Sequence, residues 1–266
     1  MVDEFGDRMK MYEKLQQQRF MPLLPVCVRL DGKSFSIWTK GLNRPFDQNM
    51  MSIMRDVTIQ LVKETGACMG YTQSDEISLV LYTDNIKSQI FFDGKIQKII
   101  SVLAARTSVL FNFYVQRVIP DKAGDLAVFD CRAWQVPNKI EAANTLLWRE
   151  QDATKNSISM AARSFYSHNE LINKSGAVMQ DMLMDKGVNW NNYPNQFKRG
   201  VFIQKRKVSR KFTNDELARL PNKHEALKNP DLLVERNKIY AMDMPIFKRV
   251  TNRVDVIFNG ADPVVE

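Results

Sequence analysis

The feature that most constrains this chain is a polar turn with two adjacent carboxylates that leads directly into an apolar run, YTQSDEISLVLY at 71–82. The run is β-prone, so Asp75 and Glu76 lie at the mouth of a buried strand. A second acid, Asp31, directly follows another β-prone run. Carboxylates suit hard divalent cations. Since neighbouring strand ends meet in space, we hypothesise that Asp31 and Asp75 converge and hold two Mg²⁺ ions for phosphoryl transfer.

Hydrophobic periodicity and breaker residues predict an ordered series of elements in the first half of the chain. The series is a helix at 3–19, a strand at 26–30, a helix at 47–64 capped by Asp47, a short strand at 67–69, a strand ending at Tyr82, a helix at 93–118 and a strand at 127–136. After the first helix the order is β-α-β-β-α-β. This order is typical of an α+β, ferredoxin-like βαββαβ palm with an antiparallel sheet and helices on one face.

The character of the sequence changes after Pro137. Helices are predicted at 138–167 and 175–186, followed by a basic β-like segment at 201–203 and an apolar tail at 254–258. We therefore expect two parts. A palm-like catalytic domain occupies residues 1–137, and a helical, basic C-terminal half occupies residues 138–266 and packs on the palm.

The charge of the chain favours a polyanionic partner. Net charge is +8, and the segment 198–211 holds seven basic residues without an acid. Such a segment is either a solvated strand edge or a track for a phosphate backbone, and the sequence leaves both open. The basic residues are Lys198, Arg199, Lys205, Arg206, Lys207, Arg210 and Lys211.

Other composition features exclude several classes of protein. Three cysteines lack metal-ligand spacing and are predicted to be free thiols of a reducing compartment, while two histidines are too few for a zinc site or a histidine-based triad. The N-terminal segment is acidic and does not resemble a signal peptide. No apolar run approaches the ~20 residues of a membrane span. We expect a cytoplasmic protein without a membrane partner.

The motif Asp31-Gly32-Lys33-Ser34 is similar to the end of a phosphate-binding P-loop, but the pattern fails. A P-loop requires glycine five residues before Gly32, where this chain has Cys27. An acid before the glycine would also repel a phosphate unless a cation lay between them. Because Gly32 lets the backbone approach closely, its carbonyl is a candidate further cation ligand.

Four motifs in order resemble the tRNA-histidine guanylyltransferase family: RLDGKSF at 29–35, RPFD at 44–47, TQSDEIS at 72–78 and FDCR at 129–132. The resemblance extends over about residues 5–210. It implies an enzyme that extends RNA in the 3′→5′ direction on a palm with two metal ions, as polymerases and nucleotide cyclases do. The expected substrates are ATP or GTP, other nucleoside triphosphates and tRNA. The resemblance also implies a homotetramer.

The resemblance assigns roles to individual positions. Asp31, the Gly32 carbonyl and Asp75 match the metal ligands, and Glu76 matches a catalytic acid that supports them. The positions matching nucleotide contacts are Lys33, Ser34, Phe35, Arg44, Ser74 and Asn156. The candidate tRNA contacts are Lys155, Lys198, Arg199, Lys205, Arg206 and Lys207.

One position departs from the family pattern. Members specific for histidine tRNA carry a His-Ile-Asn-Asn-like segment, whereas this chain has TKNSIS at 154–159, with Thr154 in place of the histidine. The departure is similar to the guanylyltransferase-like protein branch, which repairs truncated tRNA 5′ ends against the opposite strand. Three alternatives stay open: histidine-tRNA-specific guanylylation, a cyclase-like enzyme on the same palm, and a non-catalytic RNA-binding module.

Overall fold

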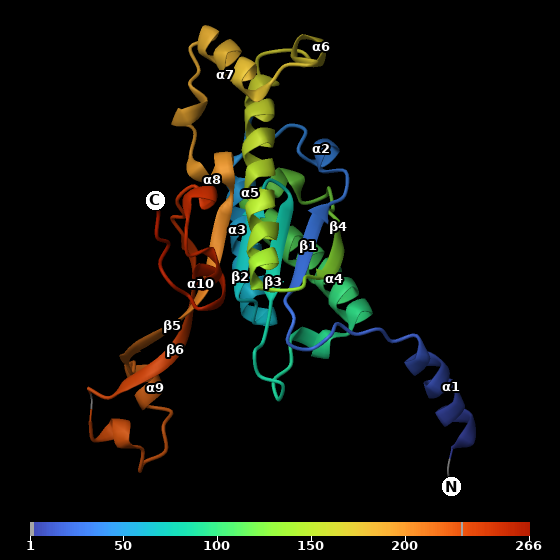
Figure 1. The fold of residues 1–266 in the computed structure, drawn as a ribbon, viewed down its shortest axis with the longest axis vertical. Helices are drawn as coiled ribbons and strands as arrows, with labels where there is room; N and C mark the ends of the chain where they lie inside the picture. The colour runs from blue at the N-terminus through green and yellow to red at the C-terminus, as the bar shows by residue number, and fades with distance from the viewer. Residues whose placement is uncertain (1–2, 230) are drawn as a thin grey trace.

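The computed structural model describes residues 3–229 and 231–266 and contains a six-stranded antiparallel sheet with helices on both faces (Figure 1). The order across the sheet is β4-β1-β3-β2-β5-β6. The strands are β1 (Val26–Gly32), β2 (Met69–Gln73), β3 (Glu76–Leu81), β4 (Phe129–Gln135), β5 (Val201–Lys211) and β6 (Leu233–Met242). The first four strands follow the predicted β-α-β-β-α-β order, with α3 (Gln48–Thr65) and α4 (Ile96–Val118) between them.

Strand alternation divides the core into two layers. In β1, Val26, Val28 and Leu30 pack in the layer that contains α3 and α4, whereas Cys27 packs in the layer that contains α5 (Lys139–Ala162). The prediction of helices on one face holds for α3 and α4. The opposite face is covered by α5 and α10 (Arg253–Phe258), which belong to the C-terminal half.

Local capping signals set the bounds of α3. The Asp47 carboxylate accepts a hydrogen bond from the Met50 amide at 3.0 Å, and Gly66 ends the helix with φ 70°. Asp47 also accepts from the Asn43 amide at 3.3 Å and is buried. The cap was predicted from the sequence and is confirmed. It also ties down the loop that carries Arg44.

Replacing Asp47 by alanine is expected to lower the free energy of unfolding by about 1–2 kcal/mol, because the Met50 amide loses its partner. Thermal unfolding should show a midpoint several degrees lower. Asp56→Ala on the same helix is the matched control, since Asp56 pairs at the surface with Arg55 and should cost less than about 1 kcal/mol. Equal midpoints for the two variants would contradict the capping role.

The hairpin of β2 and β3 begins later than the sequence indicated. The predicted strand at 67–69 is wrong in its bounds, because Gly70 lies inside β2 and does not end the strand. A Cβ atom at this position would lie 2.6 Å from Val62 and 2.9 Å from Thr58, so the glycine permits close packing of α3 on the strand.

The bounds of several other helices also differ from the predicted ones. Helix α1 (Glu4–Leu15) is shorter than predicted, has no buried residue and projects from the body (Figure 1). Helix α4 begins at Ile96 rather than at Asp93, because Phe92 and Asp93 adopt positive φ in η1 (Phe91–Gly94). The segment between the predicted strand at 26–30 and the predicted helix at 47–64 contains the short helix α2 (Phe35–Trp38).

Helix α4 is long and apolar enough to cross a membrane by length and composition alone, which differs from the sequence expectation. Its inner face nevertheless packs in the core of this protein, where Ile99, Leu103 and Phe111 are buried. Cys27 and Cys131 are buried and free, as predicted, and burial raises the pKa of the two thiols to about 11 and about 12.

The C-terminal half was predicted to be helical, and this is only partly correct. After α5, the helices of this half are α6 (His168–Leu171), α7 (Gly176–Asp185), α8 (Asn195–Arg199), α9 (Asn214–Leu217) and α10, with 3-10 turns at Trp190–Asn192, Glu225–Leu227 and Phe247–Arg249. Another 3-10 turn, Pro120–Lys122, precedes β4. The half also supplies β5 and β6. Strand β5 pairs with β2 at one end, and its basic end pairs with β6 in an arm that leaves the body (Figure 1).

Candidate active site

The structure brings the segments of Asp31 and Asp75 together at one end of the sheet. The Gly32 amide donates a hydrogen bond to the Asp75 carbonyl at 3.1 Å. In the antiparallel register, Asp31 lies opposite Glu76 of β3. Asp75 itself lies in the tight turn between β2 and β3, where Ser74 has φ 50°. Two acids that are distant in the sequence are therefore neighbours in the fold.

Asp75 is a carboxylate in an environment that favours a cation. Its pKa is raised to about 6, chiefly by burial, with smaller contributions from the negative charges of Asp31 and Glu76, while its own backbone amide and the Ser74 hydroxyl oppose the shift. An ionised carboxylate here lacks compensation, which a divalent cation would supply. The donor set of Asp31, Asp75 and the Gly32 carbonyl therefore fits a hard cation.

This donor set does not form a complete protein cage. Among the described residues, no group of three or more histidine, cysteine or acidic side chains is arranged to hold a metal ion. Two carboxylates and a carbonyl leave most positions around a cation to water and to substrate oxygens. Mg²⁺ sites that act on phosphates are commonly of this kind.

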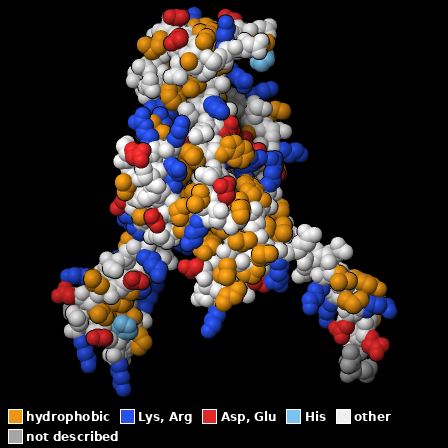
Figure 2. Space-filling model, viewed as in Figure 1, with side chains coloured by type: hydrophobic (Ala, Val, Ile, Leu, Met, Phe, Trp, Pro, Cys, Tyr) orange, Lys and Arg blue, Asp and Glu red, His pale blue; other side chains and the backbone are white. Residues whose placement is uncertain are grey.

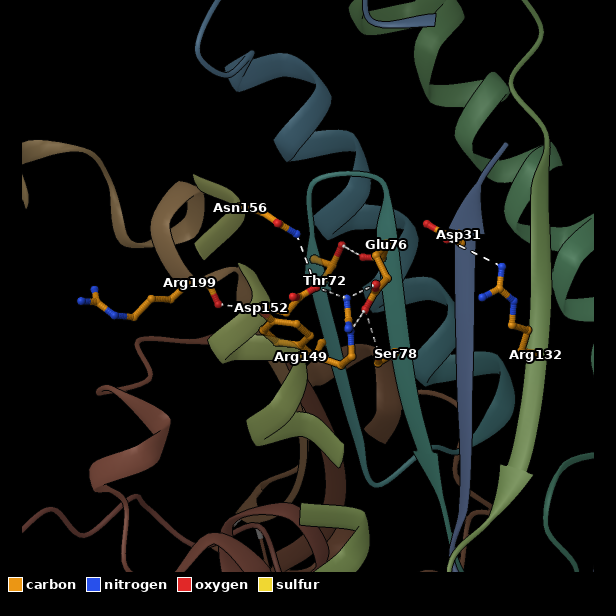
Figure 3. Close-up of polar contacts among 10 residues, drawn as sticks. Asp31, Thr72, Glu76, Ser78, Arg132, Arg149, Asp152, Asn156 and Arg199 are labelled. Atoms are coloured by element: carbon orange, nitrogen blue, oxygen red, sulfur yellow. Dashed lines mark hydrogen bonds and ion pairs between the residues drawn. The ribbon is translucent and has the colours of Figure 1, made fainter. Parts of the chain in front are cut away.

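Glu76 has a different environment from Asp75. Both of its carboxylate oxygens accept hydrogen bonds from Arg149 of α5 at 2.6 Å, and the two residues are 5% exposed each (Figure 3). The Ser78 hydroxyl donates to the same carboxylate at 3.4 Å. The resemblance assigned Glu76 a role beside the metals, and the structure places it in a buried ion pair.

A pocket of about 470 Å³ opens beside Asp75. Its volume lies within the range of small-molecule sites. Four predicted residues line it: Phe35, Arg44, Ser74 and Asp75. Its apolar wall comes from Leu42, Phe46, Met50, Met51, Met160 and Phe197, and Gln73, Ser157, Arg163 and Gln196 are among its polar residues.

Three predicted nucleotide contacts lie near this pocket without lining it. Lys33 and Ser34 are exposed in the turn before α2, and the Lys33 amide donates to the Val128 carbonyl at 2.8 Å. Asn156 is exposed on α5, between the pocket residues Ala153 and Ser157, and donates to Asp152 at 3.4 Å.

Sequence reasoning gave no role to Arg29 and Arg163 and left Arg132 undecided. Arg29 and Arg132 lie opposite each other on β1 and β4, and Arg132 is 4.0 Å from Asp31. The buried Nε of Arg29 has no hydrogen-bond partner among the described residues. Strand alternation, which puts Arg29 on the same face as Asp31, was the signal available for it.

The candidate RNA contacts are dispersed rather than gathered in one patch. Lys155 is exposed on α5. Lys198 is buried, donates to the Asn191 carbonyl at 2.6 Å and lies over the Trp190 ring, and burial and Arg199 lower its pKa. Arg199 donates to Asn195 at 3.3 Å.

The β5 members of the basic segment are paired within the chain. Lys205 donates to the Gly66 carbonyl at 2.6 Å, Arg206 pairs with Asp262 at 2.6 Å, and Lys207 lies 4.0 Å from Glu235. Figure 2 shows basic side chains along the projecting arm, interspersed with acids. The absence of acids in the linear segment therefore does not persist in three dimensions.

A pocket of nucleotide size beside two converging acids, at the end of an antiparallel sheet, is typical of the enzymes that transfer nucleotides. The family model "tRNAHis guanylyltransferase" (Thg1) matches residues 6–137. The chain belongs to this family, whose members are tRNA guanylyltransferases. It is therefore an enzyme of the nucleotidyltransferase class.

Relatives extend the match well beyond residue 137. A bacterial tRNA(His) guanylyltransferase-like protein in complex with ATP shares 41% identity, with a TM-score of 0.71 over 76% of this chain and 88% of that one. Another, in complex with GTP, shares 33% identity and a TM-score of 0.69 over 92% and 94%. "Uncharacterized protein R259" of Acanthamoeba polyphaga mimivirus is 30% identical over 77% of this chain and 78% of its own.

Proposed function

We propose that this protein is a template-dependent 3′→5′ nucleotidyltransferase that repairs the 5′ end of tRNA on a ferredoxin-like palm formed by residues 1–137. The observation that carries the proposal is the contact of the Gly32 amide with the Asp75 carbonyl, beside the 470 Å³ pocket. Asp31, Asp75 and the Gly32 carbonyl would hold two Mg²⁺ ions. When bound, the ions would activate the attacking oxygen and stabilise the leaving group.

The proposed reaction has two steps. First, an oxygen of the tRNA 5′-monophosphate attacks the α-phosphorus of ATP, and pyrophosphate leaves. Then the 3′-hydroxyl of an incoming nucleoside triphosphate attacks the 5′-phosphorus of the adenylylated end, loses its proton, and AMP leaves. Phosphoryl transfer of this kind depends on positioning and charge rather than on a nucleophilic side chain.

The pocket beside Asp75 is the proposed site of the activating nucleotide. Its apolar wall suits a base, while Ser74, Arg44 and Arg163 supply polar and positive groups for phosphates. We propose that Lys33 and Ser34, in the exposed turn before α2, also contact this nucleotide. Asn156, exposed on α5, is proposed to contact it as well. The sequence similarity to proteins in complexes with ATP and GTP supports it.

Arg29 and Arg132 are proposed to hold phosphates of the second substrate on the other side of Asp31. Arg29 lies 6.0 Å from the half-exposed Trp148 ring, which offers a stacking surface for a base. The metal ligands would then lie between two substrate positions, as a transfer from one to the other requires.

For tRNA we propose contacts from Lys155, Arg199 and the exposed Lys207, together with the partly exposed Lys205 and Arg206 of β5. Lys198 is assigned a role inside the protein, because it is buried and donates to the Asn191 carbonyl there. Residues 138–266 would thus form the tRNA-binding part of a cytoplasmic homotetramer, a proposal that rests on family resemblance.

Thr154 favours repair over histidine-specific guanylylation. Its hydroxyl donates to the Glu150 carbonyl at 2.9 Å, so the side chain serves the helix and offers no imidazole to the RNA. We therefore propose that the added nucleotide is chosen by pairing with the opposite strand, and that the enzyme does not depend on recognising one particular tRNA.

A tRNA transcript that lacks its first nucleotide, labelled and incubated with Mg²⁺ and four nucleoside triphosphates, tests this proposal. The expected product gains one 5′ nucleotide complementary to the opposite 3′ strand. Transcripts that differ only at that opposite base should gain different nucleotides. Addition of guanosine whatever the opposite base would support histidine-type guanylylation. A cyclic nucleotide formed without RNA would favour a cyclase.

A further inference from the structure

A buried network joins the acid-bearing turn to α5 through a single guanidinium group (Figure 3). Arg149 donates to both oxygens of Glu76 at 2.6 Å and also to Asp152 at 3.0 Å. We infer that Arg149 is a positioning residue that fixes the Asp75 turn relative to α5. This inference deepens the proposed function and rests on it.

On the sheet side, the network acts on the residue next to Asp75. Glu76 begins β3, lies opposite Asp31 and accepts from Ser78. The Thr72 hydroxyl donates to the Glu76 carbonyl at 2.9 Å, so the turn is also closed across its base. Because both carboxylate oxygens of Glu76 are held by Arg149, the backbone next to Asp75 has little freedom to move.

On the helix side, the same guanidinium reaches the opposite wall of the pocket. Asp152 accepts from Arg149 and, on the same oxygen, from Asn156 at 3.4 Å. The neighbouring α5 residues Ala153 and Ser157 line the pocket, as Ser74 and Asp75 of the turn do. Arg149 therefore sets the distance between the two walls that a nucleotide would contact.

The ion pair also gives Glu76 a different role from that of Asp31 and Asp75. A buried carboxylate with both oxygens bound to a guanidinium is electrically compensated and has little remaining capacity for a cation. Asp31 and Asp75 lack such a bidentate partner among the described residues; Asp31 lies only within 4.0 Å of Arg132. The structure therefore assigns cation binding to Asp31 and Asp75 and assigns Glu76 to holding the turn.

Four variants separate positioning from folding: Arg149→Met, Arg149→Lys, Glu76→Gln and the double variant Glu76→Met/Arg149→Met. Removing one partner leaves a buried charge unpaired, whereas an apolar pair of similar volume can preserve packing. Arg106→Met is the matched control, because Arg106 makes a bidentate pair with Glu64 between α4 and α3, away from the pocket.

The measurements are thermal unfolding and equilibrium binding of a fluorescent, non-hydrolysable ATP analogue with Mg²⁺. We expect Arg149→Met to unfold at a lower temperature than the wild type and to bind the analogue at least tenfold more weakly. The double variant should recover the unfolding temperature but not the affinity. Arg149→Lys should be intermediate in affinity, and Arg106→Met should bind as the wild type does.

Wild-type affinity in the double variant would overturn the inference, because the pair would then serve folding alone. Loss of Mg²⁺-dependent binding in Glu76→Gln with full binding in Arg149→Met would also overturn it, since Glu76 would then act on the metal directly. The tRNA assay is separate. A wild-type protein that binds the analogue but never extends tRNA would remove the proposed function and leave the positioning role standing.

Discussion

Replacing Asp75 by asparagine is expected to reduce nucleotide addition to tRNA at least about a thousandfold. Asparagine keeps the size of the side chain but removes the charge that would hold the cations. Metal stabilisation of a phosphoryl transition state contributes several kcal/mol, and about 1.4 kcal/mol corresponds to each factor of ten in rate. Single-turnover extension of a 5′-truncated, labelled tRNA measures the loss.

The folded state and RNA affinity of the Asp75→Asn variant should be intact. Burial raises the pKa of this carboxyl to about 6, so above that pH the ionised side chain costs stability in the metal-free protein. The variant should therefore unfold at an equal or higher temperature. Asp31→Asn should lose activity similarly, while Asp125→Asn, at an exposed pair with Lys122, should not. Activity of Asp75→Asn within tenfold of wild type would contradict the metal role.

Replacing Gly32 by alanine is expected to reduce activity about a hundredfold and to lower stability. An added Cβ would lie 2.2 Å from Cδ2 of Phe35. The Phe35 ring is 4% exposed and packs against Trp38, Phe111 and Phe129, so it has little room to yield. Overpacking of this kind costs about 1–3 kcal/mol. Displacement of an active-site group by about 1 Å costs on the order of a hundredfold in rate.

Two further variants make the Gly32 result interpretable. Gly124→Ala is the control, because an added Cβ there meets no atom within 4 Å. In Gly32→Ala/Phe35→Leu the smaller side chain relieves the clash, so part of the lost activity should return. The kcat and the unfolding temperature of each variant are the quantities to measure. A Gly32→Ala variant with wild-type values for both would show that the contact between Gly32 and Asp75 is not critical.

Local signals in the sequence were enough to predict the elements that bring the acids together. The cap at Asp47, the period of α3 and α4 and the polar turn before β3 each depend on residues close in the chain. The order of strands followed from these elements. The convergence of Asp31 and Asp75 was predicted because the ends of neighbouring strands meet in space, and the antiparallel pairing of β1 with β3 puts the end of β1 beside the start of β3.

The remaining features depend on contacts between distant segments. The Arg149 that holds Glu76 lies on a helix of the other half of the chain, and no local pattern marks it as an ion-pair partner. Strand β6 was missed because most of it forms an arm with β5 outside the body, where apolar alternation is weak. Lys198 was taken for an exposed cation because sequence cannot show that its ammonium group reaches the Asn191 carbonyl.

In the proposed mechanism, Asp31 and Asp75 jointly hold the catalytic cations. Anomalous diffraction from crystals of the protein with Mn²⁺ and a non-hydrolysable ATP analogue would locate these cations. We predict two Mn²⁺ peaks, about 3.5–4 Å apart, with oxygens of both aspartates within ~2.3 Å of a peak. Peaks that contact Glu76 in place of Asp75, or that lie away from the end of β1, would show that Asp31 and Asp75 do not hold the catalytic cations.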